Sequence, residues 1–487
     1  MHRLVIGALL LGGWAGMDAV AARPNVLFLA VDDLKPALAC AGDPHARTPN
    51  IDRLAARGLV FRRAYCQQAV CSPSRSSLLT GRRPDTTGVH DLETHFRAAL
   101  PEVVTLPQHF KNSGYYVHGV GKIYHGGYDD PASWSVPWER ARGPSYGPAG
   151  QRRLEELRSQ AGQRGADVSR VRGLPCEAPE VADAFLLDGW TANRAEEILA
   201  SRKGEAAPFF LAVGFSKPHL PFVAPRSYWE LHDPAQLPVA EPAPPPRGAP
   251  SFAPQFGGEL RKYTGIPASG PIPEATAREL VHGYYAAVSF MDAQVGRVLD
   301  ALERHGFSDD TIVILWGDHG WHLGDHGMWC KHTNYEEATR SALVLAAPGH
   351  AAAGRTTDTL VEFVDIYPTL ADLCGLPPPD GLEGHSFAPL LDDPTRAWKP
   401  AALSQYPRHG PGTGPLMGYA IRTDRYRYVE WRSRKDGAVV ARELYDHRTD
   451  PREDQSVADD PARAATVADL AAQLAGGWRG NAPGPAD

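Results

Sequence analysis

Three continuous apolar segments constrain the fold of this chain more than any other feature of its sequence. Each has polar residues at or close after its C-terminal end. A strand that is apolar at every position is buried on both faces, as in a parallel sheet with helices on both sides. Because helical stretches separate the segments, the pattern predicts an α/β sandwich that binds ligands beyond the carboxyl ends of its strands. The apolar segments are residues 25–31, 209–215 and 311–316, and the helical stretches are residues 50–57, 188–200 and 274–303.

The chain changes character after a proline-rich stretch at residues 377–379. Beyond it, residues 419–422 and 426–429 alternate as strands with a turn between them. We therefore expect a large mixed, mostly parallel sheet flanked by helices, followed by a smaller C-terminal α+β domain with an antiparallel sheet. The predicted division of the chain is a leader at residues 1–22, a large domain at residues 23–397 and a smaller domain at residues 398–487.

Two long segments show neither a helical nor a strand pattern. Residues 141–180 are rich in Gly, Arg and Glu, and residues 233–273 are dense in Pro. Both are expected on the surface, the second partly stiff and extended. Loops of this length in a compact domain commonly contact a ligand, and disorder is the alternative explanation.

The first 22 residues have the composition of a secretory signal peptide. A basic start precedes an apolar run from Leu4 to about Trp14, and an A-x-A-like site ends at Ala22. The run is too short to cross a bilayer, so we expect cleavage and no stable membrane span; a retained anchor is the alternative. Six cysteines in so long a chain are not a disulfide framework. Since the chain has no N-x-Ser/Thr sequon, we expect a periplasmic or secreted bacterial protein.

The charge of the chain limits its partners. The formal net charge is −7, which argues against a nucleic-acid binder because such proteins carry a basic surface. An anionic ligand would have to be attracted by a local basic cleft, since the overall field of the protein repels it.

Acidic residues gather where the apolar segments end. Asp32 and Asp33 follow the first segment, and Asp318 and His319 follow the third. A single Asp in this position is commonly a helix N-cap. Three carboxylates that converge on one edge instead predict a site for one hard divalent ion, Ca²⁺ in the first instance. A nitrogen ligand is less natural for Ca²⁺, so His319 either binds the ion or orients a neighbour.

Four basic or imidazole side chains accompany the acidic ones. Lys122 and His125 lie in one short motif, His219 follows the second apolar segment, and Lys331 follows the acidic motif. Each alone has an ordinary explanation as a solvated lysine or a surface histidine. Taken one at a time, each is therefore weak evidence for a site.

The segment Cys71-Ser72-Pro73-Ser74-Arg75, with Leu78-Leu79-Thr80-Gly81-Arg82 after it, resembles the signature of the formylglycine-dependent sulfatases. The resemblance covers nearly the whole mature chain and is strongest to the iduronate 2-sulfatases, which share Asp-His-Gly-Trp with residues 318–321. Further matching segments are residues 67–70, 81–87, 120–125, 208–219, 284–297, 404–408, 417–419 and 443–451.

The resemblance implies an alkaline-phosphatase/sulfatase-like fold in which residues 23–397 form the catalytic domain. It also implies that a formylglycine-generating or anaerobic sulfatase-maturating enzyme oxidises Cys71 to formylglycine. The implied metal ligands are Asp32, Asp33, Asp318, His319 and the formylglycine at Cys71. The implied catalytic roles are Arg75 to fix the formylglycine hydrate, Lys122 and Lys331 to clamp sulfate, His219 as the acid and His125 as the base.

The same resemblance implies a substrate, a sulfated saccharide. We expect an exo-acting 2-O-sulfatase on iduronate-like uronic acids of glycosaminoglycans or similar polysaccharides. Lys122, His219 and Lys331 would contact it, and Trp321 would stack on a sugar ring or, alternatively, be packing. Other hypotheses are a sulfatase on another glycan or an aryl sulfate, and a phosphonate or phosphate ester hydrolase. A non-catalytic glycan binder is disfavoured because binding alone needs no such array.

Overall fold

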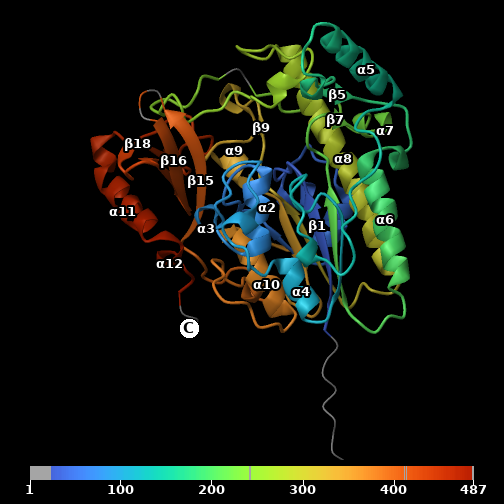
Figure 1. The fold of residues 1–487 in the computed structure, drawn as a ribbon. Helices are drawn as coiled ribbons and strands as arrows, with labels where there is room; N and C mark the ends of the chain where they lie inside the picture. The colour runs from blue at the N-terminus through green and yellow to red at the C-terminus, as the bar shows by residue number, and fades with distance from the viewer. Residues whose placement is uncertain (1–22, 241–242, 411, 413, 485–487) are drawn as a thin grey trace, which may run out of the picture.

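The computed structural model describes residues 23–240, 243–410, 412 and 414–484. The predicted signal peptide at residues 1–22 lies outside the described residues. At the centre is a seven-stranded sheet (Figure 1). In order across the sheet, its strands are β13 (Arg355–Thr357), β2 (Leu59–Phe61), β12 (Leu343–Ala346), β8 (Thr311–Gly317), β1 (Asn25–Val31), β6 (Phe209–Phe215) and β4 (Tyr116–Gly121).

The predicted mixed, mostly parallel sheet is confirmed. Only β12 runs antiparallel to its neighbours, β8 and β2, whereas β4, β6, β1 and β8 are parallel to one another. The three apolar segments form β1, β6 and β8, as expected for strands whose two faces are both covered.

Helices cover both faces of this sheet, and the side chains of β1 alternate between two cores. Leu27, Leu29 and Val31 pack into one core, and Val26 and Phe28 into the other. The predicted helices are present, and the first begins at Pro49, where a proline is favoured in the first turn. The helices on the first face are α1 (Pro49–Ala55), α6 (Leu187–Ser201) and α8 (Glu274–Arg304), and those on the second are α2 (Cys71–Thr80), α4 (Leu106–Asn112) and α10 (Ile366–Leu373).

A second, four-stranded sheet follows the large one in the chain and lies beside it (Figure 1). It is antiparallel throughout, as the alternating pattern predicts. One helix packs its apolar face, including Leu470 and Leu474, against this sheet. The elements are β15 (Ala401–Gly410), β16 (Gly414–Thr423), β17 (Tyr426–Ser433), β18 (Val439–Asp446) and the helix α11 (Ala464–Ala475).

The two segments predicted as surface excursions differ from each other. Residues 141–180 contain a helix, α5 (Pro148–Gln163), and a short strand, β5 (Cys176–Glu177), that pairs with β7 (Phe222–Val223). Within residues 233–240 and 243–273, the described backbone forms a 3-10 turn at Leu260–Lys262 and two isolated β-bridges, Arg247 with Gln455 and Phe256 with Trp329. The remaining short elements are β3 (Ala64–Tyr65), β9 (His322–Leu323), β10 (Trp329–Cys330), β11 (Arg340–Ser341), β14 (Val361–Glu362), α3 (Pro84–Thr87), α7 (Arg226–Trp229), α9 (Glu336–Thr339) and α12 (Gly477–Gly480).

Among the described residues, none of the helices combines the length and apolar character that crossing a bilayer requires. All six cysteines are free thiols in the structure.

Candidate active site

The carboxyl ends of β1 and β8 meet at one edge of the large sheet, because the strands are parallel neighbours with Val31 opposite Gly317. The acidic residues that follow them therefore lie side by side, and the backbone N–H of Asp33 donates to Asp318 Oδ1 at 2.9 Å. The close approach requires glycine at position 317, since a Cβ there would lie 2.4 Å from the Leu34 carbonyl oxygen. The structure thus brings the two acidic motifs together at the predicted edge.

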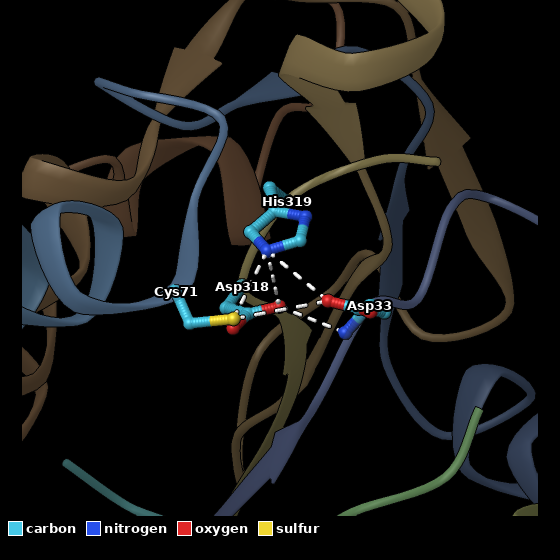
Figure 2. A group of neighbouring side chains, drawn as sticks. All are labelled: Asp33, Cys71, Asp318 and His319. Atoms are coloured by element: carbon cyan, nitrogen blue, oxygen red, sulfur yellow. Dashed lines mark hydrogen bonds and ion pairs between the residues drawn. The ribbon is translucent and has the colours of Figure 1, made fainter. Parts of the chain in front are cut away.

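Helix α2 brings Cys71 to the same edge at its first residue. The thiol Sγ lies 3.4 Å from His319 Nε2 and 3.8 Å from Asp33 Oδ1. Figure 2 shows these side chains and Asp318 pointing toward one another. One ligand atom from each of the four residues lies within 4.8 Å of the others, and all four residues are buried. Four of the five predicted metal ligands therefore form one group.

Asp32, the fifth predicted ligand, lies beside this group rather than in it. Its Oδ1 accepts from Arg75 Nη2 at 3.2 Å, and its Oδ2 forms an ion pair with Lys122. It shares a second candidate group with Asp33 and His219. Burial alone would raise the pKa of the Asp32 carboxyl, but Lys122 and the other cations nearby hold that pKa well below its usual value. Asp32 is therefore ionised.

The donor set of the main group fits a divalent cation. Burial raises the pKa of the Asp33 carboxyl, although Lys331 attracts its negative charge. A divalent cation between crowded, buried carboxylates would offset this cost. Carboxylate oxygens are the ligands that hard cations prefer, and His319 contributes a nitrogen that transition metals and zinc also accept.

Arg75 lies one helical turn after Cys71 and is fully buried. Its Nε donates to Asp318 Oδ2 at 2.9 Å. Its Nη1 donates to the carbonyl oxygens of Lys122 and Ile123 at 2.6 and 2.9 Å. Its Nη2 also donates to Asp32, which follows β1. This one guanidinium therefore connects α2 with the carboxyl ends of β1, β4 and β8.

The two predicted lysines lie on either side of the acidic pair. Lys122 contacts Asp32, and Lys331 Nζ donates to both carboxylate oxygens of Asp33 at 3.0 Å. Burial would lower the pKa of Lys331, but Asp33 raises it well above its usual value. Both lysines therefore carry positive charge at the edge of the sheet where an anion would bind.

The two predicted histidines differ in how they hold protons. His219 Nε2 lies 3.8 Å from Asp33 Oδ2, and Nδ1 lies 2.5 Å from the Leu220 carbonyl oxygen. Burial would lower the pKa of His219, but Asp33 raises it above its usual value. Burial and the charge of Lys122 lower the pKa of His125 to about 4. Near neutral pH, His219 is thus suited to give a proton and His125 to accept one.

The position of Trp321 corrects the prediction that this residue stacks on a sugar ring. The side chain is only 1% exposed and packs against Tyr284 and Phe222. Its ring centroid lies 4.9 Å from Lys331 Nζ, a cation–π contact. Trp321 is therefore a packing residue that supports Lys331, in agreement with the alternative interpretation.

The structure adds one residue that the sequence did not single out. Glu259, from the proline-rich segment, places Oε1 at 3.1 Å from His219 Nε2 and Oε2 at 2.8 Å from Lys331 Nζ. No local motif marks this glutamate, because its position depends on how a long irregular segment packs against the sheet edge.

The chain is similar to known proteins over most of its length. A family model described as Sulfatase matches residues 24–376, and one described as N-sulphoglucosamine sulphohydrolase, C-terminal, matches residues 324–477. The chain is 35% identical to the iduronate 2-sulfatase of Mus musculus, over 90% of this chain and 91% of that protein.

Solved structures share the fold. One, in complex with its substrate D-glucosamine-2-N,6-O-disulfate, has a TM-score of 0.73 at 21% identity and covers 96% of this chain and 100% of its own. The phosphonate monoester hydrolase of Agrobacterium radiobacter has a TM-score of 0.70 at 26% identity and covers 94% and 95%.

Proposed function

The chain belongs to the sulfatase family of sulfuric ester hydrolases, and from this premise we propose that it is an exo-acting 2-O-sulfatase. Its substrate would be an iduronate-like uronic acid at the end of a glycosaminoglycan or a similar sulfated polysaccharide. The choice of sugar draws its support from the similarity to iduronate 2-sulfatase over nine-tenths of the chain.

The observation that carries the proposal is the convergence of acidic, basic and imidazole side chains with Cys71 at one sheet edge. A sulfate monoester is anionic, and the sugar alkoxide that leaves it is a poor leaving group. A site that hydrolyses it must neutralise the sulfate oxygens, supply a nucleophile and protonate the leaving oxygen. Each of these needs has a candidate side chain at this edge.

Two lysines would bind the sulfate group. Lys122 and Lys331 each contact one carboxylate of the acidic pair, so both ammonium groups are held in place before substrate arrives. Their positive charges act in a buried site, where electrostatic attraction is stronger than in water. The lysines would therefore hold the sulfate oxygens while the bond to the sugar breaks.

Cys71 would not act as a thiol. Burial and the charge of Asp32 raise the pKa of this thiol well above its usual value, so the reactive thiolate is scarce. We infer that a formylglycine-generating or anaerobic sulfatase-maturating enzyme oxidises Cys71 to formylglycine. The hydrate would supply two hydroxyl groups on one carbon, one to attack sulfur and one to expel sulfate. Arg75, one turn along the helix, would keep residue 71 in position.

The two histidines would move protons. His219 would donate the proton on Nε2 to the oxygen of the leaving sugar, since its Nδ1 contacts the Leu220 carbonyl oxygen and Nε2 faces the site. His125 is neutral near pH 7 because its pKa is about 4, so it would accept a proton from residue 71. This division of roles follows from the opposite directions of the two pKa shifts.

A single cation, which we propose to be Ca²⁺, would be held by Asp33, Asp318 and His319 with residue 71, and Asp32 would lie at its side. When bound, it would supply positive charge that neutralises the sulfate oxygens and lowers the pKa of the nucleophile. The carboxylate-rich donor set supports a hard cation, and the imidazole leaves other divalent ions open to test.

A second candidate function is the hydrolysis of phosphonate or phosphate esters. The similarity to a phosphonate monoester hydrolase over most of both chains supports it. The same lysines and cation would hold a phosphoryl group, so the geometry of the anion site alone does not separate the two ester classes.

A screen of defined sulfated disaccharides, including positional isomers, tests the proposal. We expect the fastest release of sulfate from a terminal 2-O-sulfated uronic acid. Parallel assays with an aryl sulfate, an aryl phosphate and a phosphonate monoester compare the ester classes. Faster turnover of the phosphorus esters would overturn the sulfatase assignment, and faster turnover of another positional isomer would overturn the choice of substrate.

We also propose that the protein acts in the periplasm or outside a bacterial cell after its signal peptide is removed. The sulfated polysaccharides that it would degrade are found outside cells, which agrees with this location. Fractionation of expressing cells, with N-terminal sequencing of the mature protein, tests both export and cleavage after residue 22.

A further inference from the structure

Glu259 bridges two groups of the proposed active site. Its Oε1 lies 3.1 Å from His219 Nε2, and its Oε2 lies 2.8 Å from Lys331 Nζ. The side chain is 23% exposed, whereas the Lys331 side chain is 2% exposed. A carboxylate from outside the sheet edge thus contacts both the lysine and the histidine.

The backbone around Glu259 is anchored by its neighbours. Leu260 and Tyr263 are buried in the core on the first face of the sheet. Phe256 forms a β-bridge with Trp329, two residues before Lys331. Because both flanks of the glutamate are held by packing, its carboxylate lies at a defined place in the site.

Glu259 is the fourth carboxylate at this edge. Arg75, Lys122 and Lys331 match the three carboxylates of Asp32, Asp33 and Asp318 in number, and Glu259 lies beside His219 and Lys331. Burial would raise the pKa of Glu259, but Lys331 and His219 hold it well below its usual value, so the carboxylate is ionised. The partners of Glu259 are the groups proposed to receive the anionic ester.

We propose that Glu259 is a specificity-determining residue that takes the place of the ester's anionic group in the free enzyme. The inference rests on the roles proposed above for Lys331 and His219. An entering sulfate must replace the Glu259 carboxylate as the partner of Lys331 and His219. The contacts that sulfate forms are therefore offset by the contacts that Glu259 loses. Free sulfate then binds weakly, and substrates are retained only when their sugar adds further contacts.

The exchange has a consequence for turnover. Inorganic sulfate, the product, offers no sugar to compensate for displacing Glu259. The carboxylate can re-form its contacts with Lys331 and His219 as sulfate leaves, which favours product release. A site without this carboxylate would bind product more tightly and be inhibited by it more strongly.

The test compares sulfate binding with and without the charge on Glu259. The full-length, metal-loaded Cys71→Ala protein is titrated with inorganic sulfate by calorimetry, alone and with Glu259→Gln. The amide keeps the shape of the side chain and loses its charge. We expect Glu259→Gln to bind sulfate about tenfold more tightly, the size of effect that removing one nearby, partly desolvated like charge produces.

The chain offers a matched control at Glu139. This glutamate also bridges a histidine and a cation, with 2.9 Å to His118 Nε2 and 2.8 Å to Arg194 Nε, and its side chain is 25% exposed. Glu139→Gln should leave the sulfate affinity unchanged within about twofold. Glu259→Asp, which keeps the charge, should not reproduce the gain of Glu259→Gln.

The outcomes separate this inference from the proposed function. Unchanged or weaker sulfate binding in a folded Glu259→Gln protein would overturn the role of Glu259. Equal gains in Glu259→Gln and Glu139→Gln would overturn it as well, since they would reflect only the net charge. Sulfate binding is measured without turnover, so the two proposals can fail separately. If the wild-type protein desulfates no sugar but Glu259→Gln binds sulfate more tightly, the proposed substrate is overturned and this inference stands.

Discussion

Two of the places where the molecule buries charged side chains are the active-site edge of the large sheet and the contact of the antiparallel sheet with β3 and α9. We call the second group the joint cluster. Both contain carboxylates, arginines and histidines, so composition does not distinguish them. The joint cluster comprises Tyr65, Glu336, Arg422, Arg427, His447 and Glu453.

The charges of the joint cluster satisfy one another. Arg427 pairs with Glu336 and donates to Glu453 Oε1 at 2.6 Å. Arg422 Nε donates to Glu336 Oε2 at 3.1 Å, and His447 Nε2 lies 2.9 Å from Glu453 Oε1. Two of these carboxylates and the histidine are close enough to hold a metal ion. The guanidinium groups already supply the positive charge there, so we expect the cluster to hold the antiparallel sheet against β3 and α9 rather than to bind a cation.

The active-site edge keeps unused binding capacity. His125 Nδ1 is buried and has no hydrogen-bond partner among the described residues. The pKa of the Asp33 carboxyl is raised. The pKa of the Cys71 thiol is raised as well, so the thiol stays protonated beside the carboxylates. Buried polar groups left in this state are costly unless a ligand completes them. The comparison suggests that a buried charge cluster is structural when its members saturate one another, and functional when they do not.

The sharpest way to separate the two clusters is to remove the nucleophile. Cys71→Ser would accept sulfate once but lacks the second hydroxyl that expels it, so steady-state turnover should fall by at least about 10³-fold. Its free energy of unfolding should change by about 1 kcal/mol or less. A single-turnover burst measures the first step, and continued steady-state sulfate release would contradict the role of residue 71.

Breaking the joint cluster should have the opposite result. Arg427→Met removes the cation that the buried Glu336 and Glu453 share and should lower the free energy of unfolding by about 3–5 kcal/mol. The folded fraction should retain its kcat. Urea unfolding measures the loss. The control is Arg425→Met at the more exposed ion pair with Asp446, which should cost about 1 kcal/mol or less; equal losses in both variants would contradict the structural role.

His219→Ala tests the proton donor. Sugar sulfates need a proton on the leaving oxygen, so their kcat/KM should fall by about 10²- to 10³-fold. Activated aryl sulfates leave without a proton and should lose much less. Equal losses on the two substrates would remove the acid role from His219.

The smallest expected effect is on stability in acid. Burial would raise the pKa of Glu336, but Arg422 and Arg427 hold it well below its usual value. A carboxyl whose pKa is lowered by folding stabilises the protein above its unfolded pKa, about 4.3, and this contribution is lost as the pH falls toward the folded pKa. The free energy of unfolding should therefore decrease below about pH 5. The decrease should be shallower in Arg427→Met; parallel pH profiles would contradict this source of stability.

Much of the fold and the site could be predicted from the sequence. The strands β1, β6 and β8 are buried at every position and almost wholly apolar, and this pattern is local. The residues just after a parallel strand must lie at the sheet edge, so the strand pattern alone places Asp33 and Asp318 there. The domain division at residues 397 and 398 stays a prediction.

The features that the sequence could not reveal depend on long-range packing. The prediction that Trp321 stacks on a sugar ring is wrong because the side chain is buried against Tyr284 of α8, and this contact cannot be read from the local sequence. Glu259 lies in a segment without periodicity, and long-range contacts, the burial of Leu260 and Tyr263 and the bridge of Phe256 to Trp329, bring it to the active site. Helix α5 lies within a segment expected to be an irregular excursion, and its only buried residue is Gly150.

The most direct measurement for this account is the mass of the peptide that contains Cys71, taken from the active, fully matured protein. The account predicts a mass shift from thiol to aldehyde at this one residue, together with release of sulfate from a sugar substrate. An unmodified cysteine in a preparation that still desulfates sugars at the full rate would contradict it.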